Sequence, residues 1–169
     1  MESVESLQAS LAALTRRVEA LEAAPVEDRA PVETADPMWV LEGIKQRHSA
    51  PGAIYYSGAV QVAAGPIEWQ IGLPVERVLE EDWSLAAASL ASLGNPVRLS
   101  LLQAVMGGAG SVSELSAGEG MGTTGQLYHH LNQLVAQGWL LATGRGHYAI
   151  PPEKVVPLLV ILTAARRVS

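Results

Sequence analysis

The four histidines of the chain are the side chains best suited to metal binding or proton transfer, and their spacing disfavours a shared site. His129 and His130 are adjacent, so on a helix they point about 100° apart and one metal ion cannot easily use both. His48 and His147 lie far apart and could form a site only if folding brought them together. Because Leu131 follows it on the fold-facing side, we expect His130 to be a hydrogen-bonded structural histidine rather than a ligand or a base.

The other residue patterns that catalysis or redox chemistry needs are missing. The chain has no cysteine, which excludes disulfides, thiolate zinc sites and thiolate sensing of metals or arsenic. It contains no P-loop, no Rossmann glycine fingerprint, no nucleophile elbow and no pair of metal ligands at helical spacing. We therefore expect no enzyme activity, no bound metal and no cofactor.

Aromatic side chains gather in a segment with the period of a β-strand. Residues 53–63 are rich in Ile, Tyr and Val, residues 67–73 alternate strictly, and Ala, Gly and Pro between them favour a turn. This pattern predicts a β-hairpin with one of two roles. Its aromatic face senses a small apolar effector or binds a partner, or the sheet shields the core or extends a dimer interface. The aromatic residues are Tyr55, Tyr56 and Trp69.

The N-terminal residues carry a continuous apolar stripe. Val and Leu recur three and four residues apart from Val4 to Leu21, which predicts a coiled-coil dimerisation helix over 1–23, with a parallel pair of chains as one arrangement. The alternative is an amphipathic helix that folds back on its own core. Prolines predict an extended linker over 24–37. The next segment, 38–82, is expected to hold a short helix over 38–47 and the hairpin.

From residue 83 onward the apolar residues recur with a helical period, and Gly, Asn, Ser and Thr stand where helices begin and end. A short helix, a glycine-containing turn and a longer helix after Thr123 form a helix-turn-helix. Two strands that enclose a tight turn with Arg145 at its tip form a wing. The combination predicts a winged helix-turn-helix domain over 83–150. The expected helices span 83–93, 95–107, 112–117 and 123–138, and the expected strands span 139–141 and 147–150.

Four segments of this half resemble the ArsR-type winged-helix repressors, over about residues 85–150. They are LASLGNPVRLSLLQAV, SVSELSAG, GTTGQLYHHLNQLVAQGWL and GRGHYAI. The resemblance implies a dimeric domain that binds duplex DNA, followed by a C-terminal dimerisation helix over 151–169. The metal-sensing members use cysteines that this chain lacks, so metal control is not carried over.

The resemblance places the first half of the fourth helix in the DNA major groove. There Gln126 could pair with adenine, and the helix N-terminus near Thr123 could face a phosphate. Arg145 would reach a phosphate or the minor groove. Arg98 has two interpretations, a phosphate contact or an ion pair that anchors the fold, and Tyr128 has packing against the wing as its alternative. The implied DNA-binding residues are Thr123, Thr124, Gly125, Gln126, Tyr128, His129, Arg145 and Arg98.

Charge is distributed unevenly along the chain, whose formal net charge is −6. Acidic residues concentrate in the first quarter, whereas residues 85–150 hold Glu114 and Glu119 against Arg98 and Arg145. The expected DNA-binding region is therefore about neutral, and we expect weak electrostatic affinity. No apolar run reaches the roughly 18 residues that span a bilayer, and no secretory signal is readable, so we expect a cytoplasmic protein without a membrane partner.

The sequence thus predicts a mainly α-helical protein with a small β component. Its parts are a winged helix-turn-helix domain, an N-terminal coiled-coil helix, an added β-hairpin and a C-terminal dimerisation helix. The expected function is that of a homodimeric bacterial transcription regulator, with repression preferred, that binds double-stranded DNA and can take a small-molecule effector. The alternative is a winged helix that recruits protein partners without sequence-specific DNA binding, which the acidic balance favours.

Overall fold

The computed structural model describes residues 13, 15, 38–118 and 122–166 of the chain. The chain divides into two units, Met1–Gly43 and Ile44–Ser169, at a boundary inside helix α2 (Trp39–Arg47), and each unit is described by itself. The predicted coiled-coil helix and linker lie outside the described residues, apart from the helical Ala13 and Thr15. In the first unit, α2 begins within the short helix that the sequence predicts.

In the second unit, β1 (Ala53–Val62) and β2 (Gly65–Pro74) form the expected antiparallel hairpin. Ala53 pairs with Pro74 and Val62 pairs with Gly65, so the two strands match along their whole length. Gly65 has a φ of 120°, a backbone conformation that residues with a Cβ rarely adopt. This accounts for glycine at this end of the turn. Apolar residues alternate along both strands, and the register therefore places them on one face of the hairpin.

Three short helices follow the hairpin, namely α3 (Val75–Glu80), the 3-10 helix η1 (Trp83–Ala86) and α4 (Ala87–Leu93). The Asp82 side chain accepts a hydrogen bond of 2.9 Å from the Ser84 N–H and caps η1. The Trp83 indole N–H donates to the Val78 carbonyl at 2.7 Å and ties η1 to α3. Helix α3 is not among the helices predicted from the sequence, and the single helix predicted over 83–93 is divided into η1 and α4.

The next helices match their predicted positions, with α5 at Pro96–Met106, α6 at Val112–Ser116 and α7 at Thr124–Ala136. Asn95 caps α5 by accepting from the Arg98 N–H at 3.2 Å, and Pro96 occupies the first turn, where its missing N–H costs nothing. Part of the turn between α6 and α7, residues 119–121, lies outside the described residues.

The second hairpin consists of β3 (Leu141–Gly144) and β4 (His147–Ala149), with Arg145 and Gly146 in the turn. The predicted first strand over 139–141 is wrong by two or three residues. Trp139 and Leu140 are buried, so burial of these two side chains competes with strand pairing at this point. The last helix, α8 (Pro152–Ala165), contains Pro157 and buries Val155, Val156 and Leu158.

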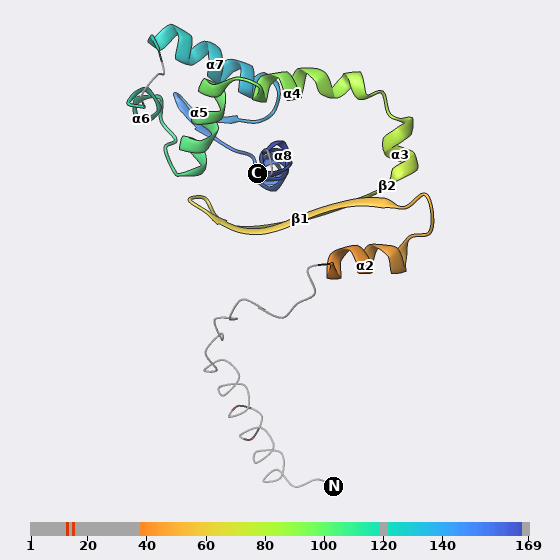
Figure 1. Ribbon diagram of the computed structural model, residues 1–169. Coiled ribbons are helices and arrows are strands. Elements are labelled where there is room, and N and C mark those ends of the chain that lie inside the picture. Colours follow the sequence, from red (N-terminus) through yellow and green to blue (C-terminus); the bar gives the residue numbers. More distant parts are fainter. Residues whose placement is uncertain (1–12, 14, 16–37, 119–121, 167–169) are drawn as a thin grey trace, which may run out of the picture. The chain divides into compact units, whose positions relative to one another are not determined.

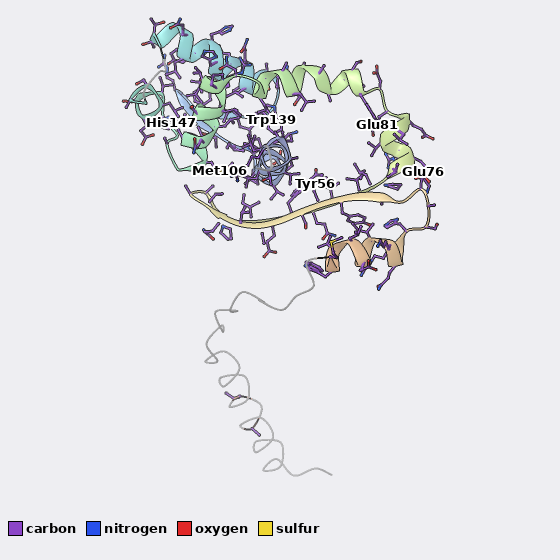
Figure 2. All side chains as sticks on the ribbon, viewed as in Figure 1. Tyr56, Glu76, Glu81, Met106, Trp139 and His147 are labelled. Atoms are coloured by element: carbon purple, nitrogen blue, oxygen red, sulfur yellow. The ribbon has the colours of Figure 1, made fainter. Side chains whose placement is uncertain are left out.

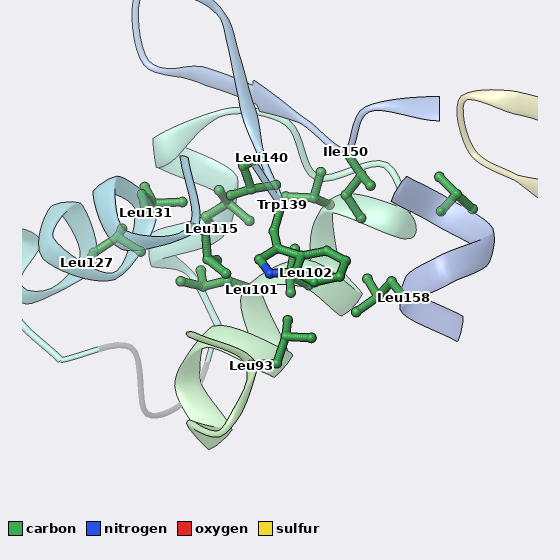
Figure 3. Close-up of a cluster of buried hydrophobic side chains, with 13 residues drawn as sticks. Leu93, Leu101, Leu102, Leu115, Leu127, Leu131, Trp139, Leu140, Ile150 and Leu158 are labelled. Atoms are coloured by element: carbon green, nitrogen blue, oxygen red, sulfur yellow. The ribbon is translucent and has the colours of Figure 1, made fainter. Parts of the chain in front are cut away.

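One apolar core joins α5, α6, α7 and α8, and Figure 3 shows leucines from these helices around Trp139. The Trp139 indole N–H donates to the Ser89 carbonyl at 3.3 Å, and the Lys154 ammonium lies 5.3 Å from the centre of its ring. These contacts connect α4 and α8 to the core. The described part of the chain is thus a mixed α and β fold that contains helices and two small antiparallel hairpins.

Helix α8 lies next to both strands of the β1–β2 hairpin and is seen end-on in Figure 1. A Cβ at Gly58 would lie 3.0 Å from a methyl carbon of Val156, so the strand approaches the helix where β1 has no side chain. Within the described residues no single helix has the length and apolar character needed to cross a membrane, although Trp83–Leu93 and Pro96–Met106, bent by 78°, meet the test as a pair.

Candidate nucleic-acid interface

The N-terminus of α7 is held by a reciprocal capping box. The backbone N–H of Thr123 donates to Oε1 of Gln126 at 2.8 Å, and the N–H of Gln126 donates back to the Thr123 hydroxyl at 3.4 Å. Gly122 has a φ of 72°, and a Cβ there would collide with the Gln126 amide. The glycine before Thr123 therefore allows this capped start of the helix.

The N-terminal half of α7 presents the predicted contact residues to solvent. Leu127 and Leu131 point into the core, with 1% and 0% of their surface exposed. The opposite side of these turns is exposed, which gives the helix one buried and one open face. The structure therefore brings six of the eight implied residues together on one segment. These exposed residues are Thr123, Thr124, Gly125, Gln126, Tyr128 and His129.

The capping role of Gln126 restricts how it could contact a base. A bidentate contact to adenine uses the amide oxygen as acceptor and the amide nitrogen as donor. In this structure the oxygen already accepts from the Thr123 N–H, and the Thr123 hydroxyl lies 3.3 Å away. Gln126 could therefore donate to a base freely, but a bidentate contact requires its oxygen to accept from the base in addition to the N–H and the hydroxyl of Thr123.

A second capping box begins α6 and connects it to the small hairpin. One carboxylate oxygen of Glu114 accepts from the N–H groups of Gly110 and Ser111, at 3.1 and 2.8 Å. Hydrogen bonds from the backbone and the hydroxyl of Ser111 hold the pKa of Glu114 below its ordinary value, with smaller contributions from Gly110 and His147. The Ser-x-x-Glu spacing at 111–114 indicates this capping box, although the sequence analysis did not use it.

The β3–β4 hairpin is fixed to this helix start by backbone hydrogen bonds. The Val112 N–H donates to the Gly146 carbonyl at 2.9 Å, and the Tyr148 N–H donates to the Gly110 carbonyl at 2.8 Å. Ser111 and His147 form an isolated antiparallel bridge between these bonds. The turn that carries Arg145 is therefore positioned relative to α6 by the main chain.

Arg145 is exposed at the tip of this hairpin, and its guanidinium has no partner among the residues that the structure describes. Its carbonyl oxygen lies 3.1 Å from Nδ1 of His147, a contact that restrains the turn while leaving the charged end in water. An unpaired arginine on a fixed turn is suited to contact a phosphate.

Arg98 lies elsewhere and uses its donors inside the fold. Its guanidinium donates to the Ser92 carbonyl, to the Ala91 carbonyl at 2.9 Å and to the amide oxygen of Gln133 on α7. It thereby ties the end of α4 to the second half of α7. Of the two interpretations, the structure displays an anchoring role, made by hydrogen bonds to neutral oxygens in place of the expected ion pair. The role of Gln133 was not predicted from the sequence, because its partner Arg98 is 35 residues away.

His130 is half-buried on the fold-facing side of α7, as expected, but its Nδ1 has no hydrogen-bond partner among the described residues. The expectation of a hydrogen-bonded ring is therefore wrong for this nitrogen. Burial lowers the pKa of His130, and the positive charges of Arg98 and His129 lower it further. His130 is thus kept neutral against the fold, whereas His129, with its ring centre 5.7 Å away, is exposed.

The aromatic residues of the long hairpin do not share one face. Tyr56 lies opposite Ile71 on the same face as Trp69, whereas the neighbouring Tyr55 points to the other face. There the Tyr55 ring covers Gly72, and its hydroxyl lies 2.7 Å from Nε2 of His48. A single effector face made from all three aromatic residues is therefore not formed.

Among the described residues no group of three His, Asp or Glu side chains could hold a metal ion. Comparison of the chain with protein-family models finds no match, and comparisons with curated proteins and with solved structures find none either.

Proposed function

We propose that this chain is a homodimeric transcription regulator that binds duplex DNA, with α7 in the major groove and β3–β4 as a wing. The observation that supports it is the order of α5, α6, α7, β3 and β4, in which α7 exposes a polar N-terminal half and the hairpin exposes one unpaired arginine. A recognition helix reads base edges with its N-terminal residues, and a wing positions the protein through the backbone.

The two parts have separate tasks in this proposal. Thr124, Tyr128 and His129 are exposed on α7 and supply donors, acceptors and apolar groups for base edges, while the start of α7 faces a phosphate. Arg145 contacts a phosphate or the minor groove. The backbone ties the wing to the start of α6, which fixes the position of Arg145 relative to that helix. Occupancy of the operator then blocks RNA polymerase.

The charges of this region set the expected strength of binding. With Arg98 occupied inside the fold, Arg145 is the arginine left for phosphate contact between residues 85 and 150. Each phosphate contact contributes about −0.9 to the slope of log affinity against log salt on duplex DNA. We therefore expect a shallow slope and specificity that comes mainly from α7.

Binding of the full chain to a labelled duplex pool, measured by fluorescence anisotropy across salt concentrations, tests this assignment. Arg145→Ala should weaken binding to all sequences and flatten the slope by about 1 for each phosphate that the arginine neutralises. Arg47→Ala is the matched control, because Arg47 is exposed on α2, outside α7 and the β3–β4 hairpin, and its loss changes the net charge equally. Equal effects of the two substitutions would contradict a phosphate contact made by Arg145.

A second function is favoured by one observation. The exposed face of α7 has no Lys or Arg, and the chain is acidic overall, which suits a module that recruits a protein partner. A folded dimer that binds no duplex DNA at low salt would support this alternative.

A further inference from the structure

The rest of the second unit covers only part of the apolar face of the β1–β2 hairpin. Near the turn, Val60, Val62 and Ile67 pack against the core, and Val156 of α8 fills the space over Gly58. Farther along the same face, Ile54 and its cross-strand partner Leu73 are exposed, Ile54 by 57%. The outer half of this face thus lacks the packing that its inner half has.

Exposed apolar side chains continue from this half of the hairpin into the helices that follow it. Leu79 on α3 is 62% exposed, Trp83 on η1 is 64% exposed and Leu85 is 81% exposed. These helices follow β2 directly, and the Trp83 indole is bonded to α3, so the side chains belong to one connected segment. We name the set the outer apolar surface. It consists of Ile54, Leu73, Leu79, Trp83, Leu85, Leu90 on α4 and Leu162 on α8.

Taken together, the side chains of the outer apolar surface expose a large apolar area for a monomer. Monomeric proteins rarely expose contiguous apolar patches above a few hundred Å², and larger patches mark interaction sites. Each partner in a stable dimer buries about 800 Å². Seven large side chains, each more than one third exposed, represent an area of that order. Helix α8 leads to the same conclusion, since most of its residues are apolar and yet Leu162 is exposed.

The charges beside this surface complement one another between two copies. Glu76 and Glu80 on α3 and Glu81 and Asp82 after it are exposed, with Arg77 as the neighbouring cation, and Figure 2 shows Glu76 and Glu81 at the end of the hairpin away from His147. Arg166, at the end of α8, is exposed and carries the opposite sign. A two-fold axis places the same pair of contacts on both sides of an interface.

We propose that the outer apolar surface binds the same surface of a second copy, with the α8 end of each copy against the acidic α3 segment of the other. The inference rests on the homodimer of the proposed function and assigns its interface to the hairpin, α3 and η1 as well as to α4 and α8. The hairpin is then a dimer clamp rather than a sensor. The acidic segment disfavours an anionic lipid surface in its place.

The dimer dissociation constant of the full chain, measured by sedimentation equilibrium without DNA, tests this interface. Leu14→Pro is placed in every sample to interrupt the predicted N-terminal coiled coil. Ile54→Thr with Leu79→Gln keeps strand and helix propensity but removes apolar side chains from the surface. This pair should raise the constant by roughly 100-fold. The control Leu141→Gln alters a side chain that is 50% exposed on β3, outside the surface, and should change the constant by less than about threefold.

Charge supplies a second readout. Arg166→Glu should weaken the dimer, and more strongly at low salt than at high salt, because exposed charge pairs are screened. Equal constants for the double variant and the control would overturn the proposal. So would a monomeric Leu14→Pro protein, or monomers that co-sediment with phosphatidylcholine vesicles. If the substitutions weaken the dimer as expected but the protein binds no DNA, the proposed function is refuted and the proposed interface is retained.

Discussion

Replacing Arg98 with methionine should destabilise the fold and leave the DNA affinity of the folded protein unchanged. The guanidinium donates to the carbonyls of Ala91 and Ser92 and to the side chain of Gln133. Methionine has a similar length and no donor, so the end of α4 loses the bonds that tie it to α7. The substitution removes hydrogen bonds without removing much packing.

The magnitude follows from these bonds and their surroundings. A hydrogen bond from a charged group contributes about 1.5–3 kcal/mol. Arg98 is only half-buried, so water can reach part of the freed carbonyl groups and reduces the loss. We therefore expect Arg98→Met to lower the free energy of unfolding by about 3 kcal/mol in total.

Urea unfolding followed by tryptophan fluorescence and circular dichroism measures this loss. Arg77→Met, at an exposed arginine on α3, is the matched control and should change the free energy of unfolding by less than about 0.5 kcal/mol. DNA binding is then measured well below the melting temperature of each variant. A loss below about 1 kcal/mol, together with weaker DNA binding, would refute the anchoring role and return Arg98 to the phosphate contacts.

Three further predictions address the core, a helix start and a titrating group. Leu131→Ala, at a site with 0% exposure, should cost about 2–5 kcal/mol in urea unfolding, and a loss near zero would contradict its place in the core. Ser111→Ala removes the cap of α6 and should lower the free energy of unfolding by about 1 kcal/mol in thermal melts, whereas no change would mean that the capping box does not form. Burial lowers the pKa of His130, so the unfolded chain binds a proton at this ring more readily than the folded chain does. The free energy of unfolding should therefore be highest above about pH 6.5 and should fall as the pH drops below that value. His130→Gln should reduce this dependence in urea titrations at several pH values, and an unchanged dependence would assign it to other groups.

Local signals in the sequence were sufficient to predict the helices that begin with a strong capping residue and the strands whose apolar and polar residues alternate. Asn95 and Pro96 predict the start of α5, Thr123 predicts the start of α7, and alternation predicts the β1–β2 hairpin. Helix α3 has only six residues, too few for a helical period to be distinguished. The prediction for β3 starts two residues too early because Trp139 has strand character in the sequence but packs in the core.

Some features of the candidate site could likewise be predicted from local sequence, and others could not. Exposure of the first half of α7 follows from its apolar period, because Leu127 and Leu131 define the buried side. The oxygens around Arg98 come from α4 and α7, so their meeting depends on tertiary packing and cannot be read from local sequence. In contrast, the separation of Tyr55 from Tyr56 follows from strand alternation alone, and the sequence analysis did not apply that rule to the aromatic face.

Selection of bound sequences from random duplex DNA tests whether α7 and the β3–β4 hairpin recognise a specific operator. Purified full chain and the Arg145→Ala variant would be selected side by side at one fixed salt concentration. The full chain should enrich a palindrome with half-sites about 10 base pairs apart, and the variant should lose this enrichment. No enriched sequence at low salt, from protein that is folded and dimeric, would contradict DNA recognition by α7 and its wing.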